Sequence, residues 1–104
     1  MTALFDPTAY PSTSVEWIQK LIAYDTTSRE SNLELIHDVQ AYLQQQGLET
    51  VLTHDASGRK ANLFATIPAA DGTRTGGIVL SGHTDVVPVD GQNWSSDPFK
   101  AEIP

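Results

Sequence analysis

Cysteine is absent from the 104-residue sequence, which excludes disulfide bonds and thiolate metal sites. Any metal ion must therefore be held by imidazole nitrogen and carboxylate oxygen atoms. Long apolar runs are missing as well, since none approaches the ~20 residues that a membrane-spanning helix needs. The first residues, MTALFDPTAYP, lack the basic flank and apolar core of a secretory signal. We therefore expect no membrane partner and a cytoplasmic location.

Basic residues are scarce: 6 Lys and Arg stand against 13 Asp and Glu, for a formal net charge of −7. This charge repels phosphate backbones and anionic lipid, so nucleic acid is not an expected partner. The composition, 39% hydrophobic and 18% charged, lies in the ordinary range of globular chains. The length allows one small domain with one core.

Two segments carry apolar residues at helical spacing. The first begins near residues 12–14, where Thr13 and Glu16 have the spacing of a capping box. The second follows Ser31, which repeats that spacing with Glu34, and Gly47 suits its C-terminal stop. The apolar faces comprise Val15, Ile18, Leu21 and Ile22 in the first helix, and Leu35, Ile36, Val39, Tyr42 and Leu43 in the second.

Three segments rich in β-branched and aromatic residues follow the helices. LETVLTH and ANLFATIP are separated by the turn-like DASGRK, and a second turn region, AADGTRTGG, leads into a third strand from Ile78 to about His83. The fold class that this order predicts is α/β, with helices packed on a mixed β-sheet. After Val86 the chain reads as an irregular loop that ends at KAEIP, so we expect the domain to be incomplete.

An imidazole and a carboxylate end the predicted third strand. In extended backbone His83 and Asp85 point to one face, roughly 6.5 Å apart along the chain, and Thr84 points to the other. Gly82 leaves room for close approach of another group. The carboxyl end of a buried strand is the usual position of sites in open α/β sheets.

Metal ligation with an orienting carboxylate is the chemistry that suits this pair. A neutral imidazole binds a metal through one ring nitrogen, and a carboxylate that accepts the other N–H sets the tautomer and aim. His83 is thus a candidate ligand and Asp85 its orienting group. The alternative is a His and an Asp that only hydrogen-bond nearby loop amides. A metal hydrolase also needs further ligands and a base, which the sequence does not display.

Other histidine and acidic residues have simpler structural interpretations. His37 falls on a polar helix face and is expected to be solvated, and His54 with Asp55 precedes ASGRK in a turn.

The loop after the third strand contains two further carboxylates and two large aromatic side chains. Asp90 and Asp97 stand in turn-forming dipeptides, Asp-Gly and Asp-Pro. Trp94 and Phe99 are predicted to pin this loop to the core.

The stretch LSGHTDVVPVDGQNWSSDPF resembles the first metal-site segment of the di-zinc aminoacylase and carboxypeptidase family of metallopeptidases. GHTDVVP is shared by several branches of that family, whereas VPVDGQ followed by W and DPF is similar to the branch that deacetylates N-acetylornithine. TSRESNLELIHDVQAYLQQQGLET also resembles the early helices of that branch, so the resemblance extends from about Ser14 over nearly the whole chain.

The resemblance implies that His83 is a ligand of one metal ion and that Asp85 is the catalytic-site carboxylate that orients its ring. Residues 1–104 would be the N-terminal portion of a zinc-peptidase-like catalytic domain. The bridging Asp, the Glu-Glu pair with the general base, the remaining ligands and the lid and dimerisation domain would be absent from it. Zn²⁺ or Co²⁺ would be the cofactor, with two ions in a full-length enzyme that is a homodimer.

The reaction implied is hydrolysis of a small-molecule N-acyl amino acid, N-acetylornithine, to ornithine and acetate in arginine biosynthesis. With one ligand and no base, this chain alone is expected to be inactive. Alternatives are a succinyl-diaminopimelate desuccinylase, a hydrolase of other N-acyl amino acids or peptides, and a non-catalytic α/β module. Imidazole and carboxylate also suit manganese, so the sequence leaves the metal's identity open.

Overall fold

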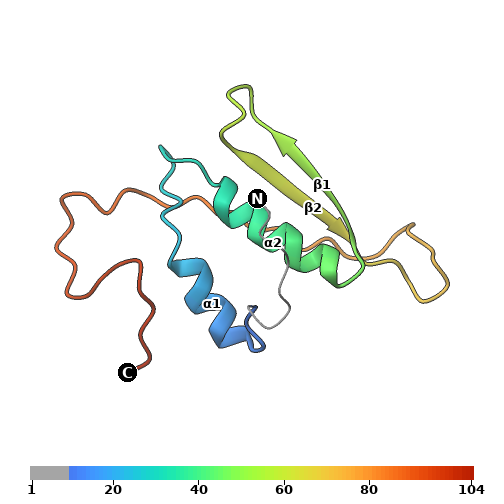
Figure 1. The fold of residues 1–104 in the computed structure, drawn as a ribbon, viewed down its shortest axis with the longest axis horizontal. Helices are drawn as coiled ribbons and strands as arrows, with labels where there is room; N and C mark the ends of the chain where they lie inside the picture. Colours follow the sequence, from blue (N-terminus) through green and yellow to red (C-terminus); the bar gives the residue numbers. More distant parts are fainter. Residues whose placement is uncertain (1–9) are drawn as a thin grey trace.

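The computed structural model describes residues 10–104, and the prediction about a targeting signal falls mostly outside them. The elements are α1 (Ser14–Ile22), α2 (Leu33–Gln45), β1 (Glu49–His54) and β2 (Ala61–Thr66). Figure 1 shows α2 lying along one side of the β1–β2 hairpin, with α1 on the other side of α2. No helix within residues 10–104 has the length and apolar composition that crossing a bilayer requires.

The start of α1 follows the predicted capping box. Thr13 is the N-cap, and its hydroxyl accepts from the Glu16 amide at 3.1 Å and donates to the Glu16 carboxylate at 2.9 Å. The second N-terminus differs in detail, because Asn32 is the N-cap and Ser31 Oγ accepts from Leu33 N–H at 3.1 Å. Both helices therefore begin where hydroxyl side chains satisfy free backbone amides.

The end of α2 confirms the predicted stop. Gly47 has a φ of 82°, its N–H donates to Gln44 O at 2.9 Å, and Leu48 N–H donates to Leu43 O at 3.1 Å. These two bonds form a Schellman motif, which satisfies the last carbonyls of the helix and requires a left-handed residue.

Gly47→Ala is expected to lower the free energy of unfolding by roughly 1 kcal/mol, because a Cβ is disfavoured in left-handed backbone. No atom would lie within 4 Å of that Cβ, so the cost is conformational and involves no clash. Gly82→Ala is the matched control, since Gly82 has an ordinary φ and the same open surroundings. Urea denaturation of both variants measures the difference, and equal midpoints would contradict the expectation.

The sheet is an antiparallel pair in which Val51 faces Phe64 and Leu52 faces Leu63. Leu52 and Leu63 turn toward α2 and pack against the buried Leu35, Ile36 and Ala61, the core of the described residues. Val51 and Phe64 lie on the opposite, exposed face. The α/β class and the packing of helix on sheet are thus confirmed, and the one parallel component within residues 10–104 is an isolated bridge between Thr27 and Val86.

The predicted third strand, from Ile78 to about His83, is wrong. Residues 76–85 carry no strand, and Ile78, Val79 and Leu80 are 89%, 77% and 93% exposed. A strand needs a neighbour that pairs with its backbone and a layer that covers its apolar face. Within residues 10–104 no element supplies either of these to the segment.

The apolar face predicted for α1 is formed but not buried. Val15, Ile18, Leu21 and Ile22 are all exposed, and no residue of α1 is buried. The helix is held to α2 instead by the Trp17–Tyr42 ring contact, with centroids 4.8 Å apart, and by Lys20 and Tyr24, which both contact the Asp38 carboxylate.

Candidate metal centre

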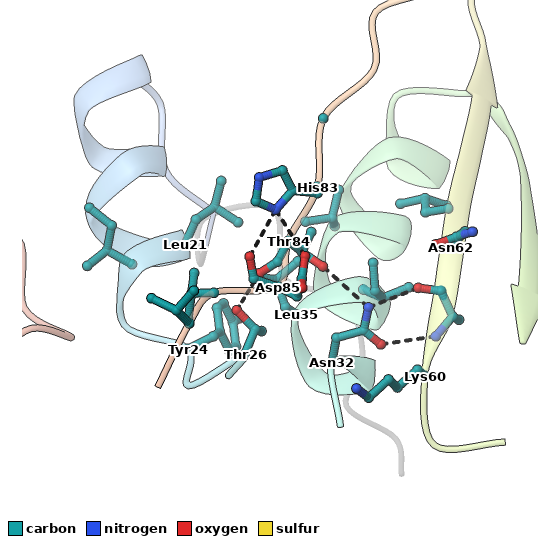
Figure 2. A pocket seen from close by; sticks show the side chains of 18 of the residues that line it. Leu21, Tyr24, Thr26, Asn32, Leu35, Lys60, Asn62, His83, Thr84 and Asp85 are labelled. Atoms are coloured by element: carbon teal, nitrogen blue, oxygen red, sulfur yellow. Dashed lines mark hydrogen bonds and ion pairs between the residues drawn. The ribbon is translucent and has the colours of Figure 1, made fainter. Parts of the chain in front are cut away.

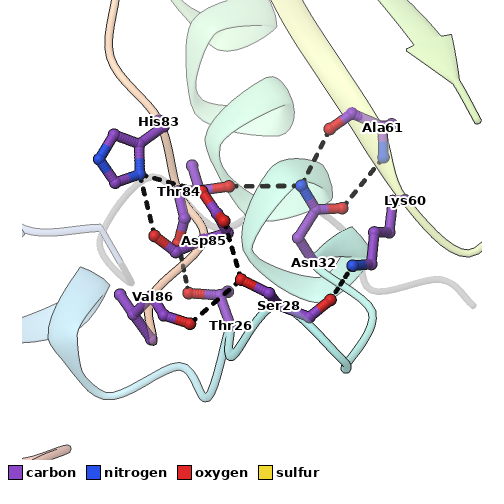
Figure 3. Close-up of polar contacts among 9 residues, drawn as sticks. All are labelled: Thr26, Ser28, Asn32, Lys60, Ala61, His83, Thr84, Asp85 and Val86. Carbon is purple, nitrogen blue, oxygen red and sulfur yellow. Dashed lines mark hydrogen bonds and ion pairs between the residues drawn. The ribbon is translucent and has the colours of Figure 1, made fainter. Parts of the chain in front are cut away.

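Residues 81–87, which carry His83 and Asp85, lie beside the loop that joins the two helices. Val86 N–H donates to Thr26 O at 3.1 Å, and Ser28 N–H donates to Val86 O at 3.0 Å. The Thr26 hydroxyl donates to Thr84 O at 2.5 Å. Figure 3 shows these contacts tying two segments almost sixty residues apart in sequence. The segment is therefore held by the helix-connecting loop, without strand pairing on a sheet.

Asn32 anchors the same segment from the other side. Its amide donates to Ala61 O at 2.9 Å and to Thr84 Oγ1 at 3.3 Å, and its carbonyl accepts from Ala61 N–H at 3.0 Å. Thr84 thus faces the start of α2 and β2, whereas His83 and Asp85 share the other side, as the alternation of extended backbone predicts.

The His83 ring is in contact with Asp85 through one nitrogen. Nδ1 lies 3.0 Å from Asp85 Oδ1 and 2.9 Å from the Asp85 carbonyl oxygen. An ionised carboxylate and a carbonyl only accept hydrogen bonds, so Nδ1 must carry the proton. In the neutral ring Nε2 then keeps its lone pair, and the His83 side chain is exposed. We assign this tautomer from the hydrogen-bond partners.

The Asp85 carboxylate is held ionised by two neighbours. The Ser28 hydroxyl, which donates to Oδ2 at 2.8 Å, is the main cause that lowers the pKa of Asp85 below its usual value, and the His83 ring lowers it further. Both side chains remain exposed, at 84% for His83 and 61% for Asp85. In the neutral form of the ring, the pair therefore presents the Nε2 lone pair of the exposed His83 side chain to the surroundings.

A broad groove of about 1130 Å³ opens beside the pair (Figure 2). Its lining includes His83 and Asp85 together with apolar side chains of both helices, such as Leu21 and Leu35, and Tyr24 from the loop between them. The position of Gly82 is open, since no atom would lie within 4 Å of an added Cβ. Within the described part of the chain no other group therefore approaches Gly82 closely, although the sequence led us to expect such an approach.

A divalent cation fits this pair only in part. The exposed Nε2 lone pair, with Nδ1 bound to a carboxylate, is the arrangement of a metal-ligating histidine. A zinc site needs at least three protein ligands, and residues 10–104 bring together no group of three His, Cys, Asp or Glu side chains that could hold a metal ion. The described residues can supply one ligand and its orienting group.

The other histidines take the structural positions predicted for them. His37 is exposed on α2. His54 ends β1, and Asp55 shapes the following turn by accepting from Ser57 Oγ at 2.8 Å and from Lys60 N–H at 3.3 Å. The Ser57 hydroxyl is the main cause that lowers the pKa of Asp55.

The loop beyond Val86 is partly as predicted. Asp97 accepts from Phe99 N–H at 2.9 Å in a local turn, and Asp90 pairs with Arg29 at 2.8 Å. Trp94 is 51% exposed and, like the half-buried Phe99, lies outside the core cluster. The prediction that both rings pin the loop to the core is wrong. Both rings line the broad groove beside the helices, but neither packs against the core cluster.

Three residues that hold the site escaped the sequence-based interpretation: Thr26, Ser28 and Asn32. The segment TTSRESN reads only as a polar loop, and hydroxyl side chains in such a loop have many possible partners. No local spacing relates residue 28 to residue 85.

Comparison with curated proteins gives a consistent set of relatives. The chain is 42% identical over 72 residues to acetylornithine deacetylase of Pasteurella multocida, a match that covers 68% of this chain and 18% of that protein. It is 36% identical over 94 residues to acetylornithine deacetylase of Proteus mirabilis, covering 84% of this chain and 23% of that protein. The enzyme of the same name from Aliivibrio salmonicida is 34% identical over 89 residues, covering 80% and 22%.

No family model matches the sequence, and no solved structure matches it. The chain spans about a fifth of the length of the curated relatives that it matches. The match is nevertheless to proteins of one name and covers most of this chain. By this similarity the chain belongs to the acetylornithine deacetylase family, and it corresponds to about one fifth of the length of these relatives.

Proposed function

We propose that this chain is part of a metal-dependent amidohydrolase that converts N-acetylornithine and water to ornithine and acetate. The observation that carries the proposal is the similarity to proteins named acetylornithine deacetylase over most of the chain. The exposed Nε2 of His83, with Nδ1 bound to Asp85, supports it. In this proposal His83 is a ligand of one metal ion, and Asp85 is the carboxylate that orients the ring.

The roles of the two residues follow from their contacts. Asp85 accepts the Nδ1 proton and so holds the ring in the tautomer whose Nε2 can bind a cation. A bound Zn²⁺ or Co²⁺ ion would lower the pKa of a coordinated water and polarise the substrate carbonyl. The complete site would hold two ions in a full-length protein, and its other ligands and general base would come from outside the described residues. A single imidazole binds a cation weakly, so this chain alone would be inactive.

The proposal extends to the setting of the enzyme. The partner is a small N-acyl amino acid, the full-length protein is a homodimer, and it serves arginine biosynthesis in the cytoplasm. The chain represents the N-terminal portion of the catalytic domain, with the lid and dimerisation domain elsewhere in the full-length protein. The net charge of −7 supports the absence of nucleic acid among the partners.

An assay of the full-length protein that carries this sequence tests the proposal. Release of acetate from N-acetylornithine should require Zn²⁺ or Co²⁺ and stop when a chelator removes the metal. N-succinyl-diaminopimelate, other N-acyl amino acids and short peptides are the comparison substrates. A higher kcat/KM for one of these compounds would identify it as the substrate in place of N-acetylornithine. If none of the compounds, N-acetylornithine included, is hydrolysed, or if hydrolysis does not need metal, the proposed reaction class is refuted.

Asp85→Asn in the full-length protein should lower metal affinity or activity by about 10- to 100-fold, the usual cost of losing a carboxylate partner of a ligating histidine. The amide keeps the size of the side chain but removes the charge that holds the Nδ1 proton. Competition with a chromogenic chelator measures the affinity. Asp97→Asn, which alters a carboxylate in a separate local turn, is the control and should leave it unchanged. Equal affinities in the two variants would exclude the orienting role.

A further inference from the structure

Both oxygens of the Asp85 carboxylate are used, and by different partners. Oδ1 lies 3.0 Å from His83 Nδ1, and Oδ2 accepts from the Ser28 hydroxyl at 2.8 Å. Asp85 is largely exposed, so its own packing does not restrict rotation of the carboxylate. Two hydrogen bonds on opposite oxygens restrict that rotation, because turning the group to suit one partner breaks the other bond. The contacts form a continuous path from Ser28 through Asp85 to His83 (Figure 3).

The position of Ser28 does not depend on Asp85. Its N–H donates to Val86 O at 3.0 Å, and the preceding Thr27 is only 1% exposed. Thr27 is itself held by the Asp25 side chain, which accepts from its hydroxyl at 2.5 Å and from its N–H at 3.1 Å. The two bonds of the buried Thr27 to Asp25, together with the backbone bond of Ser28 to Val86, fix the position from which the Ser28 hydroxyl donates.

We propose that Ser28 is a positioning residue, whose hydroxyl holds the Asp85 carboxylate in the orientation that keeps the proton of His83 on Nδ1. The hydrogen-bond partners of the two ring nitrogens decide which of them carries the proton in a neutral histidine. Without Ser28, Oδ2 is left to water and the carboxylate turns freely, so Oδ1 no longer faces Nδ1 for most of the time. Of the two acceptors of the Nδ1 proton, only the Asp85 carbonyl oxygen, at 2.9 Å, then stays in place, so the neutral ring shifts in part toward the tautomer with the proton on Nε2.

The consequence for metal binding rests on the proposed function, whereas the tautomer itself does not. A ring with the proton on Nε2 has no lone pair where a cation would bind. Ser28 would thus determine the fraction of chains whose His83 is ready to act as a ligand. This places a residue of the helix-connecting loop in control of a group 55 positions further along the chain.

Long-range ¹H–¹⁵N spectra of the ¹⁵N-histidine-labelled full-length protein, freed of metal with a chelator, measure the tautomer directly. At about pH 8 an ordinary histidine is neutral, and a temperature of about 15 °C lies near the stability maximum of many domains. His83 in the wild type should show the Nδ1–H pattern. Ser28→Ala should move it toward the Nε2–H pattern, and Ser28→Thr, which keeps the hydroxyl, should restore the wild-type pattern.

Ser57→Ala is the matched control, because it removes another hydroxyl that donates to an aspartate at 2.8 Å, in the turn after β1. It should leave His83 unchanged. An unchanged His83 pattern in Ser28→Ala, or an equal change in both alanine variants, would overturn the proposal. If Ser28→Ala also shifts the amides of Thr27 and Val86, Ser28→Val decides, since valine has the shape of the threonine in the rescue variant but no hydroxyl. A wild-type tautomer in the valine variant would refute the role.

The two proposals fail in different ways. Metal content of the full-length protein reports whether His83 is a ligand, whatever its tautomer in the metal-free protein. A tautomer shift in Ser28→Ala together with metal content that is independent of His83 would sustain the role of Ser28 and refute the proposed metal ligand. Metal content that depends on His83 together with an unshifted tautomer would refute only the role of Ser28.

Discussion

His83→Ala should remove most of the bound metal and most of the hydrolytic activity from the full-length protein that carries this sequence. The substitution deletes the exposed imidazole whose free Nε2 we propose as a metal ligand. Loss of a direct ligand should exceed the ~100-fold that loss of an orienting partner costs. Elemental analysis of the purified variant gives the metal content, and the deacetylation assay gives the activity.

His37→Ala is the control for this experiment. His37 lies exposed on α2 and is not among the residues that line the groove beside the His83–Asp85 pair. Its loss should leave both metal content and activity close to wild type. Equal zinc in the two variants would remove His83 as a ligand and, with it, the role assigned to Asp85.

Ile36→Ala should unfold most of the isolated 104-residue chain at 25 °C. Ile36 is 4% exposed at the centre of the described core, and truncation of such a side chain costs about 2 to 5 kcal/mol. The fully buried apolar side chains of that core are only Leu35, Ile36 and Ala61, so we expect the isolated chain to be marginally stable. Circular dichroism during urea titration compares the variant with the wild type.

Leu80→Ala is the matched comparison for the same measurement. Leu80 is 93% exposed, and truncation of an exposed side chain changes stability by no more than about 0.5 kcal/mol. The wild type and this variant should therefore unfold at the same low urea concentration. A sharp cooperative melt of wild type that survives Ile36→Ala would contradict both the expected marginal stability and the position of the core.

The helices and the hairpin were predictable because the information that specifies them is local. The caps at Thr13 and Gly47 and the turn between β1 and β2 depend on residues within five positions of one another. The alternation of apolar and polar residues in β1 and β2 predicts that one face of each strand packs against another element, but it does not identify that element.

The predicted strand from Ile78 to about His83 shows where such local information ends. The run of β-branched and apolar residues is real, but a strand exists only when a neighbour pairs with it. In the described residues the bonds that this stretch needs are not supplied, and it remains extended and exposed. The candidate site nevertheless survives this error, because extended backbone alone places His83 and Asp85 on the same side.

The sequence by itself determined the two helices, the hairpin, the acidic charge and the pairing of an imidazole with a carboxylate two residues away. All of these depend on residue type and on short spacings along the backbone. The tertiary structure alone decided that α1 leaves its apolar face open, that Thr27 meets Val86, and that the hydroxyl of Ser28 reaches Asp85. Contacts between residues more than fifty positions apart depend on how the whole chain packs, and no local pattern encodes them.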